Sequence, residues 1–125
     1  FSNVPYDARC FIQVNHRNSI ETWNAFQIVF KRFTSSYNLF LDPVAAFGNN
    51  LVQVDFSPET YAIYSGDVNQ DRTVDATDVS LIDNDAANFA AGYIVTDLTG
   101  DNFVDGTDFA IADNNAANFV SAALP

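Results

Sequence analysis

Two acidic segments of the chain combine residue types and a spacing that suit the binding of calcium. The first runs from Asp67 to Asp78, and the second runs from Asp97 to Asp108, thirty residues further on. In both segments, oxygen-bearing side chains occupy positions 1, 3, 5, 9 and 12. This spacing is typical of a calcium loop of the EF-hand type, in which one short turn folds several hard oxygen ligands around a single Ca²⁺. The sequence therefore predicts two bound calcium ions.

The loop positions assign a role to each predicted ligand. Positions 1, 3, 5 and 12 supply side chains, position 7 supplies a backbone carbonyl, and position 9 binds through water. In the first loop the predicted ligands are Asp67, Asn69, Asp71, Thr73, Asp75 and Asp78. In the second loop they are Asp97, Thr99, Asp101, Phe103, Asp105 and Asp108. Because metal removal would leave carboxylates facing one another, we expect the apo form to be loosened or unfolded.

Two further loop positions predict backbone geometry and packing. Position 6 requires a left-handed backbone, which Asn102 tolerates well and Arg72 adopts at some cost. Position 8 holds Val74 in the first loop and Val104 in the second. We expect the two loops to pair with each other at these valines and to bury both side chains.

A helix is predicted after each loop. Residues 67–89 and 97–119 share twelve identities in 23 positions, so the whole loop-helix unit is duplicated. The Thr-Asp pairs at 77–78 and 107–108 predict the helix starts, where they supply N-cap chemistry and negative charge for the helix dipole. Asparagines are poor residues for a helix interior, and they predict the helix ends: Asn84, Asn88, Asn114 and Asn118.

The charge of the chain is concentrated in the same region. The formal net charge is −11, and residues 66–125 carry eleven acidic residues with Arg72 as their one base. Two bound Ca²⁺ would offset part of this charge. Nucleic-acid binding is excluded because no basic patch could neutralise phosphates. Membrane insertion is excluded because no apolar run is long enough. The chain begins at Phe1 and has no Met, so we expect it to be a piece of a longer, processed protein.

The first half of the chain predicts β-structure. Short runs rich in β-branched and aromatic residues alternate with turn signals, and they fall at residues 10–15, 20–33, 51–56 and 61–64. We expect a small, incomplete antiparallel β-sandwich-like module over residues 1–65, to be completed by preceding sequence or by another chain, followed by a calcium-binding module over residues 66–125. The predicted fold class is therefore α+β.

The duplicated loop followed by a helix, with no helix before the loop, resembles the dockerin module. The residues that carry this resemblance are Gly66–Asp71 with Thr77-Asp78 in the first repeat, and Asp97–Asp108 in the second. The resemblance implies a non-catalytic, extracellular module that docks onto a cohesin-like domain. It also implies that partner contacts cluster at loop positions 10 and 11 and along the helices. In this sequence those positions are Ala76, Thr77, Gly106, Thr107, Asp83, Asn84, Asn88, Asp113, Asn114 and Asn118.

A looser resemblance concerns the first half. The segment from His16 to Trp23 is similar to the β-module that precedes such repeats in large secreted surface proteins of Bacteroidetes-like bacteria. It implies a second function, a structural subunit of a cell-surface stalk or filament whose partner is a copy of itself. A third reading is a carbohydrate-binding module of a secreted hydrolase, with Trp23 stacking on a sugar.

Catalysis is not expected from this sequence. The carboxylates are used in the predicted metal sites, and no nucleophile motif, phosphate loop or zinc spacing is present. The single histidine, His16, lies in a polar stretch that suits a turn, and the single cysteine, Cys10, lies in an apolar run that suits packing. The function predicted first is a non-catalytic, calcium-dependent docking or assembly module.

Overall fold

A computed structural model describes residue 5, residues 7–31 and residues 36–125. Arg32 and Phe33, the last two residues of the second predicted β-run (20–33), lie outside this part of the chain. The chain divides into two compact units. The first comprises Phe1–Val14, Thr22–Ala62 and Ala123–Pro125, and the second comprises Asn15–Glu21 and Ile63–Ala122. We describe each unit by itself.

The first unit is built from short antiparallel strand pairs. Its strands are β1 (Arg9–Cys10), β2 (Gln13–Val14), β3 (Thr22–Trp23), β4 (Ile28–Val29), β5 (Val52–Phe56) and β6 (Glu59–Ala62). β1 pairs with β4, β2 with β3, and β5 with β6, each as a separate two-stranded sheet. The predicted antiparallel strands are therefore confirmed. In the described residues, however, they form separate pairs and not two packed sheets, because four of the six strands are only two residues long.

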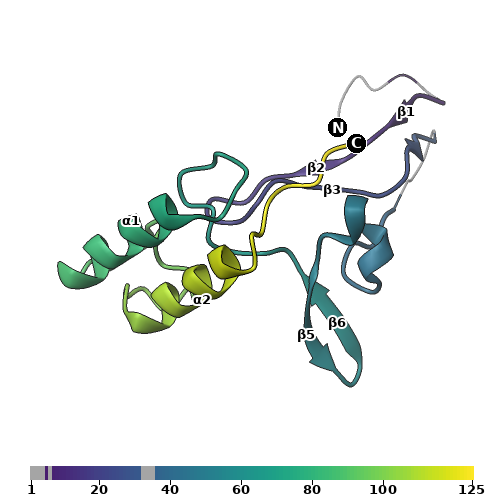
Figure 1. Ribbon diagram of the computed structural model, residues 1–125. Helices are drawn as coiled ribbons and strands as arrows, with labels where there is room; N and C mark the ends of the chain where they lie inside the picture. The colour runs from purple at the N-terminus through teal and green to yellow at the C-terminus, as the bar shows by residue number, and fades with distance from the viewer. Residues whose placement is uncertain (1–4, 6, 32–35) are drawn as a thin grey trace. The chain divides into compact units, whose positions relative to one another are not determined.

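The hairpin of β5 and β6 is the longest strand pair of this unit (Figure 1). Val52 faces Ala62 and Phe56 faces Glu59, with a register shift between Gln53 and Asp55 that marks a bulge. Two short 3₁₀ helices, η1 (Pro43–Ala45) and η2 (Phe47–Asn49), precede the hairpin. The buried apolar side chains of the unit come from this region: Leu39, Ala46 and Leu51.

The second unit holds two helices of equal length, α1 (Ala76–Ala87) and α2 (Gly106–Ala117). Each helix has a capping box: the N-cap carboxylate accepts from the third helical residue's backbone, and that residue's carboxylate accepts from the N-cap backbone. The caps are Asp75 and Asp105. The helix starts were therefore predicted about two residues late. Thr77 and Thr107 lie inside the first turn, because the aspartate before each helix takes the capping role.

The helices end where one of the two predicted asparagines stands. Asn88 and Asn118 are the C-cap residues, whereas Asn84 and Asn114 lie within the last turns. The Asn88 side chain donates to the Asn84 carbonyl at 2.8 Å, and Asn118 donates to Asn114 at 2.7 Å. The second asparagine of each pair therefore adds a side-chain bond to a carbonyl that also accepts from its own backbone N–H, which ties down the last turn of the helix.

The two repeats are joined by reciprocal backbone pairing. The segment after α1 pairs with the second loop, where Val104 N donates to Ala90 O at 3.0 Å. The segment after α2 pairs with the first loop, where Val74 N donates to Val120 O at 2.9 Å. The start of each helix therefore lies at the end of the other, and α1 and α2 run antiparallel (Figure 1).

This pairing corrects the prediction that the two loops pair with each other at their valines. Val74 and Val104 are both buried, as expected, but they lie in different hydrophobic clusters. Val104 packs with Val68, Ile82 and Ala112 between the helices. Val74 packs with Val120 and with Ile20, a residue from the first half of the chain. Each loop is thus fixed by the other repeat's post-helix segment.

The two compact units do not follow the predicted domain boundary after residue 65. Asn15–Glu21, which connects β2 to β3, belongs to the unit of the two helices. Whether residues 1–65 and 66–125 are separate domains therefore stays a prediction, and the segment 15–21 is the part of the chain on which it depends.

Candidate calcium loops

Four aspartates at the ends of the two loops are buried. Asp67 and Asp78 of the first loop are 1% and 0% exposed, and Asp97 and Asp108 of the second loop are 2% and 0% exposed. A buried carboxylate is costly unless it is hydrogen-bonded and neutralised. Within the described residues, none of these four forms an ion pair with a lysine or arginine side chain. The positive charge that neutralises these four carboxylates must therefore come from a group other than a lysine or arginine side chain.

In the first loop, backbone N–H groups hold the two buried carboxylates in place. Asp78 Oδ1 accepts from Val68 N at 2.9 Å and from Asn69 N at 3.1 Å, and its Oδ2 accepts from Asp75 N at 3.0 Å. Asp67 accepts from the backbone of residues 71 and 72, both at 3.0 Å. The residue at loop position 12 is thereby fixed against the residues at positions 2, 3 and 9.

The second loop repeats this arrangement. Asp108 Oδ1 accepts from Leu98 N at 2.8 Å and from Thr99 N at 2.9 Å, and its Oδ2 accepts from Asp105 N at 2.9 Å. Asp97 accepts from the backbone of residues 100 and 102, at 2.7 and 3.1 Å. The same loop positions bond to Asp108 as to Asp78, so the geometry at position 12 is duplicated. At position 1 only the bond from position 6 is shared, since the other donor is at position 5 in the first loop and at position 4 in the second.

The first loop brings three carboxylates close enough to share one cation. Asp67, Asp71 and Asp78 each offer an oxygen, and these oxygens all lie within 4.8 Å of one another. Two ligands on opposite sides of a Ca²⁺ ion are about 5 Å apart, since each lies about 2.3–2.6 Å from the metal. The oxygens therefore fit around a single calcium ion, and carboxylates are the hard donors that this ion prefers.

The electrostatics of Asp67 are those of a site that needs a cation. Burial raises the pKa of its carboxyl above the ordinary value, the backbone N–H groups of Arg72 and Asp71 oppose this rise, and the negative charge of Asp78 adds to it. A divalent ion beside the carboxylates would favour their charged forms. The loop geometry is therefore set for a metal, while the charges repel one another without one.

The other predicted ligands lie around these carboxylates. Asn69 donates to Asp71 Oδ2 at 3.0 Å, and Thr99 donates to Asp97 Oδ1 at 3.3 Å. Asp71 and Asp101 are exposed and accept from the backbone of Thr73 and Phe103 at 3.0 and 2.9 Å. The Phe103 ring is 63% exposed.

Asp75 and Asp105 at position 9 also cap the helices, a role that was not predicted from the sequence. Each accepts a hydrogen bond at 2.7 Å from the backbone N–H of the threonine two residues later, as the N-cap of its helix. One carboxylate oxygen of each is thereby engaged with the helix.

The backbone at position 6 is left-handed in both loops, as predicted. Arg72 has φ 80° and Asn102 has φ 72°. Position 4 is left-handed too, with φ 61° at Gln70 and 79° at Gly100. This left-handed conformation at position 4 was not predicted. In the sequence, only the glycine of the second loop indicated it. In the first loop Gln70 adopts it while its side chain donates to Asp67 O at 2.6 Å.

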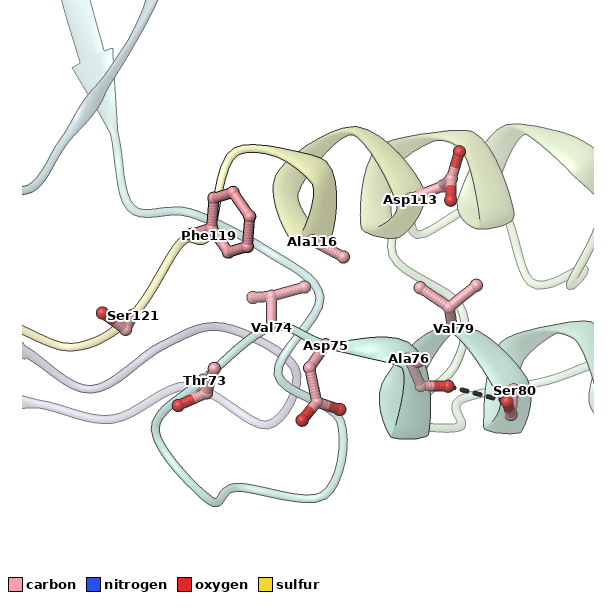
Figure 2. A pocket seen from close by; sticks show the side chains of 10 residues that line it. All are labelled: Thr73, Val74, Asp75, Ala76, Val79, Ser80, Asp113, Ala116, Phe119 and Ser121. Atoms are coloured by element: carbon pink, nitrogen blue, oxygen red, sulfur yellow. Dashed lines mark hydrogen bonds between the residues drawn. The ribbon is translucent and has the colours of Figure 1, made fainter.

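A groove runs between the start of α1 and the end of α2 (Figure 2). It has a volume of about 630 Å³. Val74, Val79, Ala116 and Phe119 form its apolar part, and Asp75 and Asp113 supply carboxylates at its edge. Figure 2 shows the Phe119 ring, just after the end of α2, and the Val79 side chain on α1 around this space. Phe119 is 87% exposed, so its ring is free to contact another molecule.

The comparisons with known proteins agree with this geometry. A family model described as the dockerin type I domain matches residues 65–117. No curated protein and no solved structure gives a significant match. Nothing in the comparisons supports the resemblance drawn for the first 65 residues to secreted Bacteroidetes surface modules. The described helices include none that is both long and apolar enough to cross a bilayer.

The match covers both loops and both helices in full. The dockerin resemblance drawn from the sequence over residues 66–119 is therefore confirmed, and with it the expectation of two calcium ions and a cohesin partner. Dockerin modules are non-catalytic and extracellular. Residues 65–117 of this chain are a dockerin type I domain, a calcium-binding module that docks to cohesin.

Proposed function

We propose that the chain as a whole is a non-catalytic component of an extracellular assembly and that calcium orders its docking face. The observation that carries this proposal is the repeated set of bonds at Asp78 and Asp108. Each residue closes its loop with one oxygen and caps the next helix with the other. An ion bound by either loop would therefore stabilise the helix that follows it.

We assign the metal ligands as predicted from the loop positions. The first ion would be held by Asp67, Asn69, Asp71, Thr73, Asp75 and Asp78, and the second by Asp97, Thr99, Asp101, Phe103, Asp105 and Asp108. The proximity of the Asp67, Asp71 and Asp78 oxygens supports the first set. The matching hydrogen bonds of Asp97 and Asp108 support the second.

The groove between α1 and α2 is the face that we propose for the cohesin. Its floor is apolar, and Phe119 stands exposed beside it. The two repeats differ here, because Phe109 occupies the position in α2 that Val79 occupies in α1, and Phe103 occupies the position of Thr73. The smaller residues of the first repeat leave room for an apolar side chain of the partner.

The rest of the chain adds support for a role in assembly. Large apolar side chains are exposed in the first unit, among them Phe26 at 69% and Phe56 at 80%. Such residues suit contact with another protein. We therefore extend the non-catalytic role to residues 1–64 and place the protein at the cell surface or in a secreted complex.

A binding assay against a panel of recombinant cohesin domains tests the proposal. The full chain in calcium should bind at least one of them, and binding should disappear in chelator. Val79→Phe, which copies the residue of the second repeat into the groove, should weaken binding about tenfold or more. Val54→Phe is the matched control, since Val54 is 57% exposed on β5 of the other unit.

The alternative function has a distinct outcome in the same experiment. A subunit of a filament would bind no cohesin but would form larger particles in calcium, as measured by light scattering. That result would refute cohesin docking by this chain and favour self-association. Retention on a polysaccharide matrix, unaffected by chelator, would instead favour the carbohydrate-binding reading.

A further inference from the structure

A short segment of the first half of the chain is built into the calcium-binding unit. Asn15–Glu21 connects β2 to β3 and lies more than forty residues before the dockerin domain. Its residues Asn18, Ser19 and Ile20 are 3%, 3% and 0% exposed. The sequence reading assigned a surface turn to this polar stretch. Its burial shows that it has partners in the unit to which it belongs.

The backbone of this segment pairs with the residues that lead into the first loop. Ile20 N donates to Tyr64 O at 3.0 Å, and Gly66 N donates to Asn18 O at 2.7 Å. Ser19 and Ser65 form an antiparallel bridge between these two bonds. The segment is thereby held in place by main-chain bonds, which do not depend on the identity of its side chains.

The side chains of the segment reach the start of the second loop. Asn18 Nδ2 donates to the backbone carbonyl of Asp97 at 2.9 Å. The Arg17 guanidinium donates to the carbonyl of Ile94 and lies 3.4 Å from that of Asp97. The same guanidinium stacks 3.8 Å over the ring of Tyr93. Two side chains thus bind the backbone of the residue that opens the second loop.

Asp97 is the position-1 ligand of the second ion, and its carboxylate direction depends on its backbone. Donors that fix the backbone of a ligand act as outer-shell partners, which orient the ligand before the metal arrives. The Arg17 charge also lies near a loop rich in carboxylates, where it reduces repulsion in the apo form. Neither residue belongs to the dockerin domain itself.

We propose that Arg17 and Asn18 are positioning residues for the second calcium loop. The affinity of that loop then depends on a segment outside the dockerin domain, and a chain cut at residue 65 would bind its second ion poorly. This inference rests on the proposed calcium ligands. It predicts a selective effect, because the backbone bonds that face the first loop survive when these two side chains are removed.

The test is calorimetric titration of the full chain with Ca²⁺ in two backgrounds. Asp71→Asn disables the first loop and leaves the second to be measured, and Asp101→Asn does the reverse. Adding Arg17→Ala with Asn18→Ala should weaken binding about 10–100-fold in the Asp71→Asn background, which is the usual cost of losing outer-shell partners. In the Asp101→Asn background the affinity should stay within about twofold.

A matched control separates position from charge. Arg9→Ala removes one positive charge, as Arg17→Ala does, but from the exposed residue that begins β1. It should leave both affinities unchanged. If the double variant loses its helical circular dichroism in calcium, Asn18→Ala alone takes its place and should still weaken only the second loop.

The possible results are distinct from those that test the proposed function. A wild-type chain that binds no calcium would refute the ligand assignment. A wild-type chain that binds two ions would leave that assignment intact. In that case, an unchanged second site, or equal losses at both sites, would overturn the positioning role of Arg17 and Asn18 alone.

Discussion

Ile20→Ala tests whether the segment between β2 and β3 is part of the folded calcium-binding unit. Ile20 is 0% exposed and packs with Val74 and Val120, which come from the first loop and from the end of the second repeat. If residues 66–125 folded independently of the first half, a substitution at residue 20 would leave the helices unaffected. The structure predicts the opposite.

The magnitude follows from the burial. The substitution removes three carbons from a fully buried side chain, which costs about 2.4 kcal/mol in transfer free energy. The cavity left against Val74 and Val120 raises the total to about 3–4 kcal/mol, within the usual range for such truncations. Leu41→Ala is the control, because Leu41 is 67% exposed and its loss should change the free energy of unfolding by less than about 0.5 kcal/mol.

The assay is urea unfolding of the full chain in saturating calcium, followed by circular dichroism at a wavelength that reports α1 and α2. A loss of about 3 kcal/mol should lower the urea midpoint of the helical signal by about 1–3 M. If Ile20→Ala and Leu41→Ala had the same urea midpoint, the reasoning would be refuted, because the stability of the helices would then not depend on residue 20.

Three further predictions concern the loops and the chain that enters them. Gly66→Ala should destabilise the chain by about 1–3 kcal/mol in thermal unfolding, because Gly66 has φ 122° and an added Cβ would lie 2.9 Å from Val74 Cγ1. Gly106→Ala, at a helix start with nothing within 4 Å, should be neutral or slightly stabilising; equal effects of the two would contradict this. Asp71→Asn should remove measurable binding at one calcium site in calorimetry, whereas Asp83→Asn on the exposed face of α1 should weaken neither. Chelator should remove much of the helical signal and the melting transition that goes with it, since two sites at 100 times their Kd contribute about 5 kcal/mol, which is as much as the whole stability of a small domain; an unchanged melting curve would count against this estimate.

The duplicated half could be predicted in some detail because its information is local. The carboxylates at loop positions 1 and 12 and the left-handed Arg72 and Asn102 all depend on spacings within one loop. The two helices could also be predicted from residues close together in the sequence. Their starts were placed late because an aspartate at position 9 can serve as a ligand or as an N-cap, and spacing alone does not rank these roles.

The rest could not be predicted because it depends on contacts between distant residues. Val74 and Val104 were correctly expected to be buried, but their partners come from the other repeat and, for Val74, from Ile20. Asn18 bonds to a carbonyl 79 residues away. A polar stretch such as 16–19 has the composition of a surface turn, and nothing within it signals that the second loop lies against it.

In the first half of the chain, the strands could be predicted but their pairing could not. Its β-prone runs were found, and β5 (Val52–Phe56) lies within the run predicted at 51–56. The pairing order was not predicted. The run at 10–15 is divided between β1 and β2, which pair with different partners, β4 and β3. Alternation identifies a strand, but the choice of partner depends on the whole fold.

The most direct test of the central claim, that Ca²⁺ held by two loops organises the C-terminal unit, is a calcium titration of the chelator-stripped chain, with heat and helical circular dichroism recorded together. The structure predicts two ions bound per chain and a rise in helical signal that saturates with the second. A chain that takes up no ion, or that shows its full helical signal before calcium is added, would contradict the claim.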